Sequence, residues 1–140
     1  MGISFVKELF TGFSTAPSAS HGPRGTSYKN EVPFDTRLAE SSNIRAIYPD
    51  RLPVIVEISE SSTNIPDLNK KKYLVPKDIT MGHLISVVRS RINLGPDFAI
   101  FAFVNEQVIC LSTQINAVYN DHKYKDGFLY VLLTSENTFG

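Results

Sequence analysis

Cys110, Asp121 and His122 are the side chains of this sequence whose types could combine into a nucleophilic catalyst. A catalytic cysteine needs a base within hydrogen-bonding distance and surroundings that lower the pKa of its thiol. Cys110 instead lies in the apolar run QVICL, where we expect a packed thiol because free cysteines are among the most buried residues. We therefore expect no catalytic residue, and a small thiol enzyme built on Cys110 is kept as an alternative.

The sequence contains no motif typical of a metal site or of a phosphate-binding loop. The three histidines, His21, His83 and His122, have no metal-ligand spacing with one another or with Cys110. The glycines are scattered and form no phosphate-binding loop. We therefore expect neither a metal site nor a cofactor.

Three consecutive lysines, Lys70 to Lys72, precede the apolar run Tyr73-Leu74-Val75. Lysines here can simply protect an edge strand from aggregation. An edge strand can also pair its backbone with an extended peptide, while its alternate side chains line pockets on two faces. The residues alone leave both interpretations open.

The chain stops at Phe139-Gly140 after a polar stretch. A terminal glycine has no Cβ, so its carboxylate can enter a narrow enzyme channel and be activated there. Most chain ends have no such role, and the terminal glycine alone does not separate the two interpretations.

Hydrophobic periodicity predicts the elements that must position these groups. At helical spacing, six apolar side chains of residues 3–13 fall in one arc of about 160°, which predicts an amphipathic helix. Residues 14–30 are rich in Ser, Gly and Pro and predict a flexible linker. Further patterns predict helices over 34–48, 80–91 and 111–118, and strands over 53–59, 71–75, 99–104, 107–111 and 128–134.

After the first helices, this is the ββαββαβ order of a ubiquitin-like β-grasp. We therefore expect an α+β fold with a mixed four-stranded sheet and additional N-terminal helices. The last strand is apolar on both faces, as a central strand covered on both sides should be. A helix placed before the β-grasp could cover the second face of the sheet.

Composition limits the function classes. A chain of 140 residues can bury a hydrophobic core without disulfide bonds or a structural metal ion. A single cysteine cannot form an internal disulfide, which fits a cytoplasmic protein. No apolar run approaches the roughly 20 residues of a membrane span. The formal net charge of zero argues against nucleic acid as a partner. Basic residues are in excess up to residue 91 and acidic ones after it, so a local basic surface could still exist.

Several motifs occur in the order found in one family: YPDRLPVIVE, IPDLNKKKYLVPKDITMG, RSRINL, AIFAFVN, HKYKDGFLYV and ENTFG. From about Val32 to Gly140, the chain resembles the autophagy ubiquitin-like modifiers, the family of GABA-A-receptor-associated protein and microtubule-associated protein light chain three. The resemblance implies a ubiquitin-like domain over residues 31–140, with an N-terminal helix and a C-terminal glycine tail. Residues 1–30 then form an N-terminal extension.

The resemblance implies a covalent membrane tag and not an enzyme. In the family, the terminal carboxylate, here that of Gly140, is adenylated by an activating enzyme and carried as a thioester to a conjugating enzyme. The amine of phosphatidylethanolamine then attacks it, and a cysteine protease processes and deconjugates the modifier. Such a protein is cytoplasmic and joins autophagosomal and related membranes when it is lipidated. The alternative is a non-covalent trafficking or cytoskeleton-binding adaptor.

The resemblance also implies a groove for cargo receptors and adaptors that carry an aromatic residue, two arbitrary residues, and then Leu, Ile or Val. The motif would add as a strand to the second strand of the β-grasp. The aromatic pocket would be lined by Glu40, Ile44, Pro53, Ile55, Lys72, Leu74 and Phe128. The aliphatic pocket would be lined by Tyr73, Val75, Pro76, Ile79, Leu84, Val87 and Arg91. Arg51 and Lys70 would form an electrostatic rim with Lys72, and strand alternation should place Leu74 and Tyr73 on opposite faces.

Three features depart from the family pattern. Cys110-Leu111 stands where many members have Pro-Pro, and Leu84 and Val87 replace larger side chains. The third is the N-terminal extension of about 30 residues. No aromatic residue in this extension is followed three positions later by Leu, Ile or Val, so it contains no aromatic-x-x-aliphatic motif. We expect its amphipathic helix to lie on a membrane or on another protein chain, with an artificial fusion or tag as the alternative.

Overall fold

The fold was obtained as a computed structural model that describes residues 27–62, 65, 66, 68, 70–92, 94 and 98–136. The predicted helix over residues 3–13, most of the predicted linker and Gly140 lie outside the described residues. None of the helices in the described part of the chain is long and apolar enough to cross a membrane.

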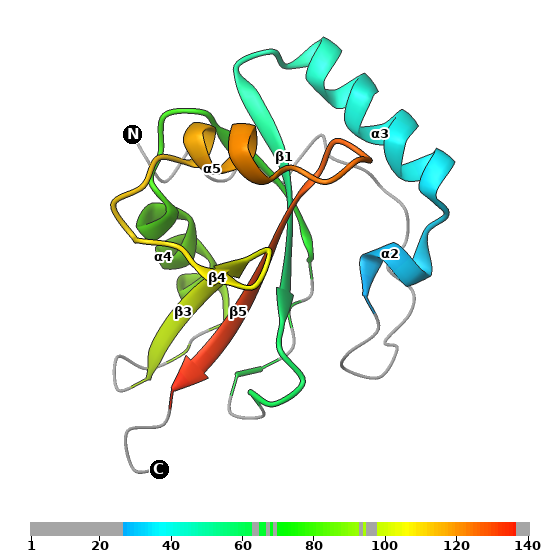
Figure 1. The fold of residues 1–140 in the computed structure, drawn as a ribbon. Coiled ribbons are helices and arrows are strands. Elements are labelled where there is room, and N and C mark those ends of the chain that lie inside the picture. Colours follow the sequence, from blue (N-terminus) through cyan, green and yellow to red (C-terminus); the bar gives the residue numbers. More distant parts are fainter. Residues whose placement is uncertain are drawn as a thin grey trace.

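From α3 onward the described elements follow the predicted order, and α2 before it was not predicted (Figure 1). The helices are α2 (Tyr28–Glu31), α3 (Phe34–Ile47), α4 (Met81–Ile92) and α5 (Ile115–His122). The strands are β1 (Arg51–Ile58), β2 (Lys72–Pro76), β3 (Ala99–Val104), β4 (Gln107–Val108) and β5 (Leu129–Glu136). Pro33 stands at the N-cap of α3, where its fixed φ suits the entry into a helix.

The strands form one mixed sheet in the order β2-β1-β5-β3-β4. β1 and β5 are parallel, while the other pairs are antiparallel. The sheet has five strands and not four, because the two-residue β4 pairs with β3 across a tight turn. Asn105 and Glu106 both have positive φ in that turn, which is the backbone geometry of a two-residue hairpin.

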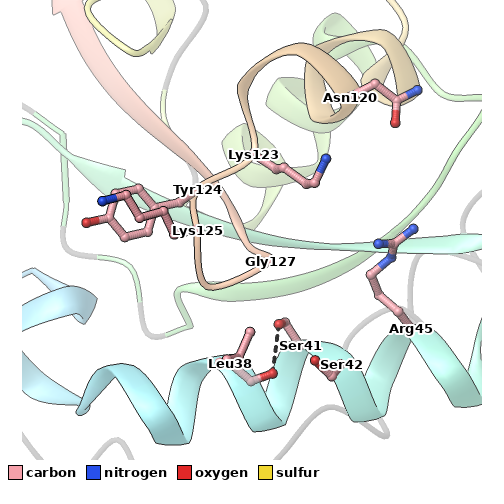
Figure 2. A pocket seen from close by; sticks show the side chains of 9 residues that line it. All are labelled: Leu38, Ser41, Ser42, Arg45, Asn120, Lys123, Tyr124, Lys125 and Gly127. Carbon is pink, nitrogen blue, oxygen red and sulfur yellow. Dashed lines mark hydrogen bonds between the residues drawn. The ribbon is translucent and has the colours of Figure 1, made fainter.

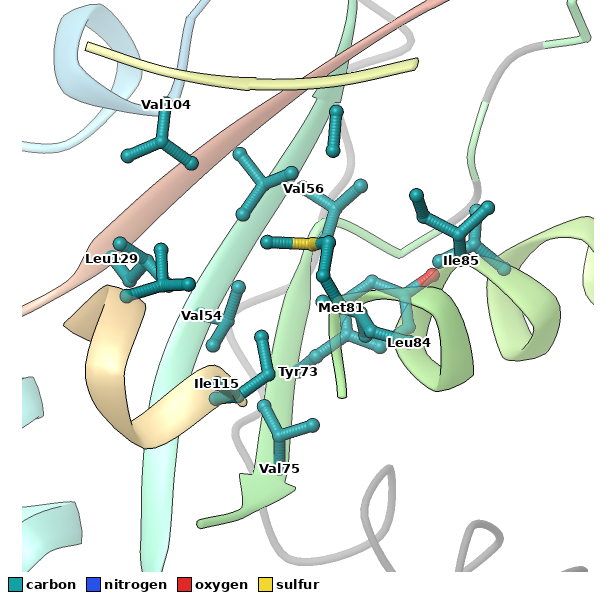
Figure 3. Close-up of a cluster of buried hydrophobic side chains, with 14 of the residues drawn as sticks. Val54, Val56, Tyr73, Val75, Met81, Leu84, Ile85, Val104, Ile115 and Leu129 are labelled. Carbon is teal, nitrogen blue, oxygen red and sulfur yellow. The ribbon is translucent and has the colours of Figure 1, made fainter. Parts of the chain in front are cut away.

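The two faces of the sheet bury separate apolar clusters. The main core lies between the sheet and helices α4 and α5, and Figure 3 shows Met81, Leu84 and Ile115 pointing toward Val54 and Tyr73. On the opposite face, α2 and α3 cover Ile55, Leu74 and Phe128. The prediction that a helix before the β-grasp would cover the second face is therefore confirmed.

The predicted domain boundary at residue 30 falls within helix α2. Residues 28–31 form α2, whose N-cap Ser27 accepts a hydrogen bond from the backbone N–H of Asn30 at 3.2 Å. Tyr28 is buried against the sheet. The ordered domain thus includes Ser27 and α2, and the linker prediction was wrong for the last residues of its range.

Two predicted boundaries between β3 and β5 were also wrong. β4 ends at Val108, and α5 begins at Ile115 and not at Leu111. The carbonyl of Leu111 accepts a hydrogen bond from Gly82 N–H at 2.9 Å, and that of Thr113 accepts from Met81 N–H at 2.9 Å. Because these bonds to the start of α4 use the local backbone, the segment is neither strand nor helix.

A buried ion pair joins α3 to the turn before β5. Arg37 donates to Asp126 at 2.5 Å, and both side chains are almost fully buried. The Asp126 carboxylate also accepts from Phe128 N–H at 2.9 Å and from the hydroxyl of Tyr130 at 2.5 Å. Such a charge is tolerated in an interior because its oxygens are paired and hydrogen-bonded. The pair fixes α3 relative to the central strand.

Candidate functional site

β2 is an edge strand of the sheet, as the sequence predicted. It pairs in antiparallel register with β1, from Arg51 opposite Pro76 to Ile55 opposite Lys72. Among the described residues, its outer side has no strand neighbour. An extended peptide could therefore add to the sheet at this edge through backbone hydrogen bonds.

Side chains of β2 alternate between the two apolar clusters, which confirms the predicted alternation. Leu74 belongs to the cluster under α2 and α3. Tyr73 and Val75 belong to the main core beneath α4. One short edge strand thus leads into an apolar layer on each face of the sheet.

The predicted aromatic pocket is closed in this structure. Ile44, Ile55, Leu74 and Phe128 are each no more than 7% exposed. Tyr28 of α2 completes this cluster, and its ring lies 5.8 Å from that of Phe128 in an edge-to-face arrangement. Pro53 is buried as well, so Glu40 and Lys72 are the members of the predicted pocket that remain partly exposed.

Glu40 connects the closed pocket to the edge strand. Its carboxylate accepts a hydrogen bond from the Tyr28 hydroxyl at 2.6 Å and pairs with Lys72 Nζ at 2.7 Å. Lys72 Nζ also lies 5.6 Å from the centroid of the Tyr28 ring. Burial and the hydrogen bond to Glu40 raise the pKa of Tyr28 above its ordinary value, so the tyrosine stays a hydrogen-bond donor. These three polar groups lie over the apolar cluster.

The predicted aliphatic pocket is divided between core and surface. Tyr73, Val75, Pro76 and Leu84 are buried, whereas Ile79 and Val87 are half-buried and Arg91 is exposed. Burial raises the pKa of Tyr73 to about 12, and the nearby Arg91 opposes that shift. The residues that a partner can reach on this face are thus Ile79, Val87 and Arg91.

The predicted electrostatic rim lies at the two ends of the β1–β2 pair. Arg51 begins β1, and its guanidinium lies 5.7 Å from the centroid of the Tyr48 ring. Lys70 is exposed two residues before β2. Lys71 forms an exposed ion pair with Glu31 of α2 at 3.4 Å. The edge of β2 therefore carries a local excess of positive charge.

The candidate thiol catalyst is not assembled. Cys110 is exposed in the loop after β4, so the prediction of a packed thiol was wrong. A hydrogen bond with Ser112 at 3.2 Å lowers the pKa of the thiol, but Ser112 is not a base. His122 contacts Asn105 at 3.2 Å instead. Within the described ranges, no group of three or more His, Cys, Asp or Glu side chains could hold a metal ion.

Tyr28 is the site residue that the sequence reasoning missed. It lies at the end of a Ser- and Gly-rich stretch, and it does not begin an aromatic-x-x-aliphatic motif because the third residue after it is Glu31. The useful signal was Ser27, a good N-cap directly before an aromatic residue and three polar ones.

Comparisons with known proteins agree with this architecture. The family model described as "Autophagy protein Atg8 ubiquitin like" matches residues 36–140. Autophagy-related protein 8 of Mycosarcoma maydis is 50% identical over 115 residues, which are 82% of this chain and 97% of that protein. Autophagy-related protein 8d of Arabidopsis thaliana is also 50% identical over 115 residues, covering 82% of this chain and 95% of that protein.

A solved structure shows the same fold. The crystal structure of Trypanosoma brucei ATG8 superposes with a TM-score of 0.75 at 37% sequence identity and covers 82% of this chain and 98% of that one. The chain therefore belongs to the Atg8 family of autophagy-related ubiquitin-like proteins.

Proposed function

We propose that this protein is a lipid-conjugated modifier that recruits cargo receptors through the edge of β2. Gly140 would be its attachment point to phosphatidylethanolamine, and aromatic-x-x-aliphatic motifs would be its peptide ligands. The observation that carries the proposal is the position of β2, an edge strand whose alternate side chains enter two separate apolar clusters.

The groove would bind a peptide by strand addition. The peptide backbone would pair with the outer side of β2, and two of its side chains would reach the two faces. Because the aromatic cluster is closed, an aromatic side chain would enter only after the Glu40–Lys72 pair over it opens. Acidic residues beside the motif would be attracted by Arg51, Lys70 and Lys72, and each exposed pair would contribute about 0.2–1 kcal/mol.

Conjugation through Gly140 fits the chemistry of acyl transfer. A carboxylate is a poor acyl donor, so activation as an anhydride and then as a thioester divides one difficult step into easier ones. The reactive cysteines belong to the partner enzymes in this scheme, and Cys110 has no part in it. Gly140 is the fourth residue after Glu136, the last residue of β5.

Reconstituted lipidation tests the attachment. The purified chain would be incubated with activating and conjugating enzymes, ATP and vesicles that contain phosphatidylethanolamine. We expect mass spectrometry to find the lipid on the C-terminal carboxylate, and deletion of Gly140 to abolish the adduct. A Cys110→Ala variant serves as the control and should be conjugated normally. Conjugation of the chain without Gly140 would contradict the proposal.

The same experiment separates the modifier from a non-covalent adaptor. An adaptor that uses the groove on a trafficking or cytoskeletal partner would bind motif peptides without forming a lipid adduct. Membrane-bound protein recovered from cells would then carry an unmodified C-terminus. A phosphatidylethanolamine adduct in that material would exclude the adaptor.

The amphipathic helix proposed over residues 3–13 calls for a separate test. Three phenylalanines in its apolar arc motivate binding to a membrane surface. Because α2 belongs to the folded domain, the deletion should remove residues 1–26 and leave Ser27 in place. We expect this deletion to reduce binding to vesicles before lipidation, and unchanged binding would count against a membrane role.

A further inference from the structure

A second surface, formed by α3, α5 and the turn before β5, has a lining suited to an anion. A cleft of about 360 Å³ lies between α3, α5 and the turn that precedes β5. Leu38, Ser41, Ser42 and Arg45 line it from α3, where their spacing places them on one helical face. Asn120, Lys123, Tyr124, Lys125 and Gly127 line it from the other side.

The charged side chains that line this cleft are all basic. Its lining contains three cations, Arg45, Lys123 and Lys125, and no carboxylate among the described residues. Asp126 lies beneath the cleft but is buried and paired with Arg37. The lining of the cleft therefore has an excess of basic side chains, on a chain whose formal net charge is zero.

Two of the cations point into the same space. Figure 2 shows Lys123 and Arg45 extending toward each other between α3 and α5, whereas Lys125 lies with Tyr124 on the other side of the turn. The Arg45 guanidinium lies 5.1 Å from the centroid of the Tyr119 ring, and Lys123 Nζ lies 5.7 Å from it. Ser42 and Asn120 add a hydroxyl and an amide to the same lining.

The walls of the cleft are held in place by buried contacts. The Tyr119 hydroxyl donates to the Gly127 carbonyl at 2.5 Å, and the Ser41 hydroxyl donates to the Asp126 carbonyl. Gly127 has a φ of +87°, and a Cβ there would come within 2.3 Å of the Ser41 hydroxyl oxygen. The turn and α3 are therefore fixed relative to each other before any ligand arrives.

We propose that this cleft binds the phosphoryl group of a phosphorylated serine or threonine in a partner protein. A phosphoserine carries a charge of about −1.5 to −2 at pH 7 and three strong acceptor oxygens. A guanidinium, an ammonium, a hydroxyl and an amide on two facing walls are suitable donors for those oxygens. The cleft is larger than a phosphoryl group, and Leu38 gives it an apolar wall for neighbouring peptide atoms.

The geometry favours a peptide over a lipid headgroup. The cleft lies at the start of β5, and the C-terminal tail begins at the other end of that strand. A strand of eight residues spans about 26 Å, so a membrane attached through Gly140 would lie far from the cleft. This choice of ligand rests on the proposed attachment through Gly140, whereas the anion site itself does not.

Nuclear magnetic resonance titration of the full chain tests the site without any lipidation. The probe is a blocked pentapeptide with a central phosphoserine between glycines, and the matched peptide carries serine. We expect the phosphopeptide to shift the amide signals of Ser42, Arg45, Asn120 and Lys123 saturably, and the serine peptide to leave them unchanged. The combined Arg45→Gln and Lys123→Gln variant should lose about ten-fold in affinity. Lys77→Gln removes one charge outside the cleft and should bind as the unmodified chain does.

Further measurements distinguish a phosphopeptide from inorganic phosphate and from a phospholipid headgroup as the ligand. Inorganic phosphate should bind more weakly than the phosphopeptide, and thermal unfolding should show that the double variant is folded. Equal binding of the two peptides, or an unchanged affinity of the double variant, would overturn the proposal. Inorganic phosphate that binds as tightly as the phosphopeptide would also overturn it. Binding to phosphatidylcholine vesicles with phosphatidic acid, with no response to the phosphopeptide, would assign the site to lipid instead.

Discussion

Tyr28 connects three parts of the proposed binding region through one residue. Its ring packs against Phe128, its hydroxyl donates to Glu40, and its backbone N–H donates to Glu57 at 2.7 Å. Because Glu40 also holds Lys72 of β2, the tyrosine links α2 to the edge strand. A side chain outside the predicted domain thus completes the apolar cluster of the predicted aromatic pocket.

Replacement of Tyr28 should show how much this closure contributes to stability. We expect Tyr28→Ala to lower the free energy of unfolding by about 3 kcal/mol, because it removes a buried ring. Tyr28→Phe keeps the ring and loses only the bond to Glu40, so it should cost about 1 kcal/mol. Urea titrations measure both values. A Tyr28→Ala variant within about 0.5 kcal/mol of the unmodified chain would mean that α2 contributes little to the folded domain.

The turn before β5 is the element that positions both proposed sites. On one side, Asp126 and Arg37 hold α3 against the sheet and keep Glu40 near Lys72. On the other side, Lys123 and Gly127 form a wall of the basic cleft. Gly127 leaves no room for a Cβ beside Ser41 of α3. A change at this contact should therefore affect the whole domain.

Gly127→Ala tests that contact. The alanine would have to adopt a φ of +87° and would place its Cβ against the Ser41 hydroxyl. We expect a loss of about 1–3 kcal/mol in the free energy of unfolding from the backbone strain, with a further loss from the clash. Measured against the Ser41→Gly single variant, which already lacks the hydroxyl, Gly127→Ala should cost only the backbone strain. A Gly127→Ala variant as stable as the unmodified chain would show that α3 can move away from the turn.

At the scale of the whole molecule, the sequence predicted the sheet well because its strands are short runs rich in apolar and β-branched residues. Ile55 and Leu74 lie on one face, while Val54 and Tyr73 lie on the other, as period two requires. What the sequence did not predict depends on contacts between distant segments. Tyr28 bonds to a residue 29 positions away, and the segment from Leu111 to Thr113 is set by bonds to the start of α4.

The basic cleft was missed for the same reason. The sequence indicated only that a basic surface could exist before residue 91. Arg45 lies in that part of the chain, but Lys123 and Lys125 come from the more acidic last third. Their proximity follows from the packing of α3 against the turn before β5, which no local pattern encodes.

The buried tyrosines predict how the stability of the whole domain depends on pH. Burial raises the pKa of Tyr28, Tyr73, Tyr119 and Tyr130. A raised pKa means that folding favours the neutral phenol, so this stabilisation is complete below the unfolded pKa of 10. It is lost as the pH rises through the folded values. For Tyr73, whose pKa is about 12, the loss amounts to about 2–3 kcal/mol.

Urea titrations at about pH 8 and about pH 12 measure this alkaline loss. The Tyr73→Phe variant has no phenol to ionise at this position and should lose less stability over the same range. If the variant and the unmodified chain lose the same amount, Tyr73 does not contribute to the alkaline transition.

The central claim, that motif peptides bind at the edge of β2, is tested most directly by mapping such a peptide onto the sheet. The isotope-labelled full chain would be titrated with an aromatic-x-x-Leu peptide, and amide signals and hydrogen exchange would be followed at both edges of the sheet. We expect shifts and slower exchange at Leu74 and its neighbours in β2, with β4 at the opposite edge unchanged. Lys70→Glu should weaken binding about two- to five-fold when acidic residues flank the motif. Replacing the peptide's aromatic residue with alanine should abolish binding, whereas shifts confined to β4, or no shift at β2, would contradict the account.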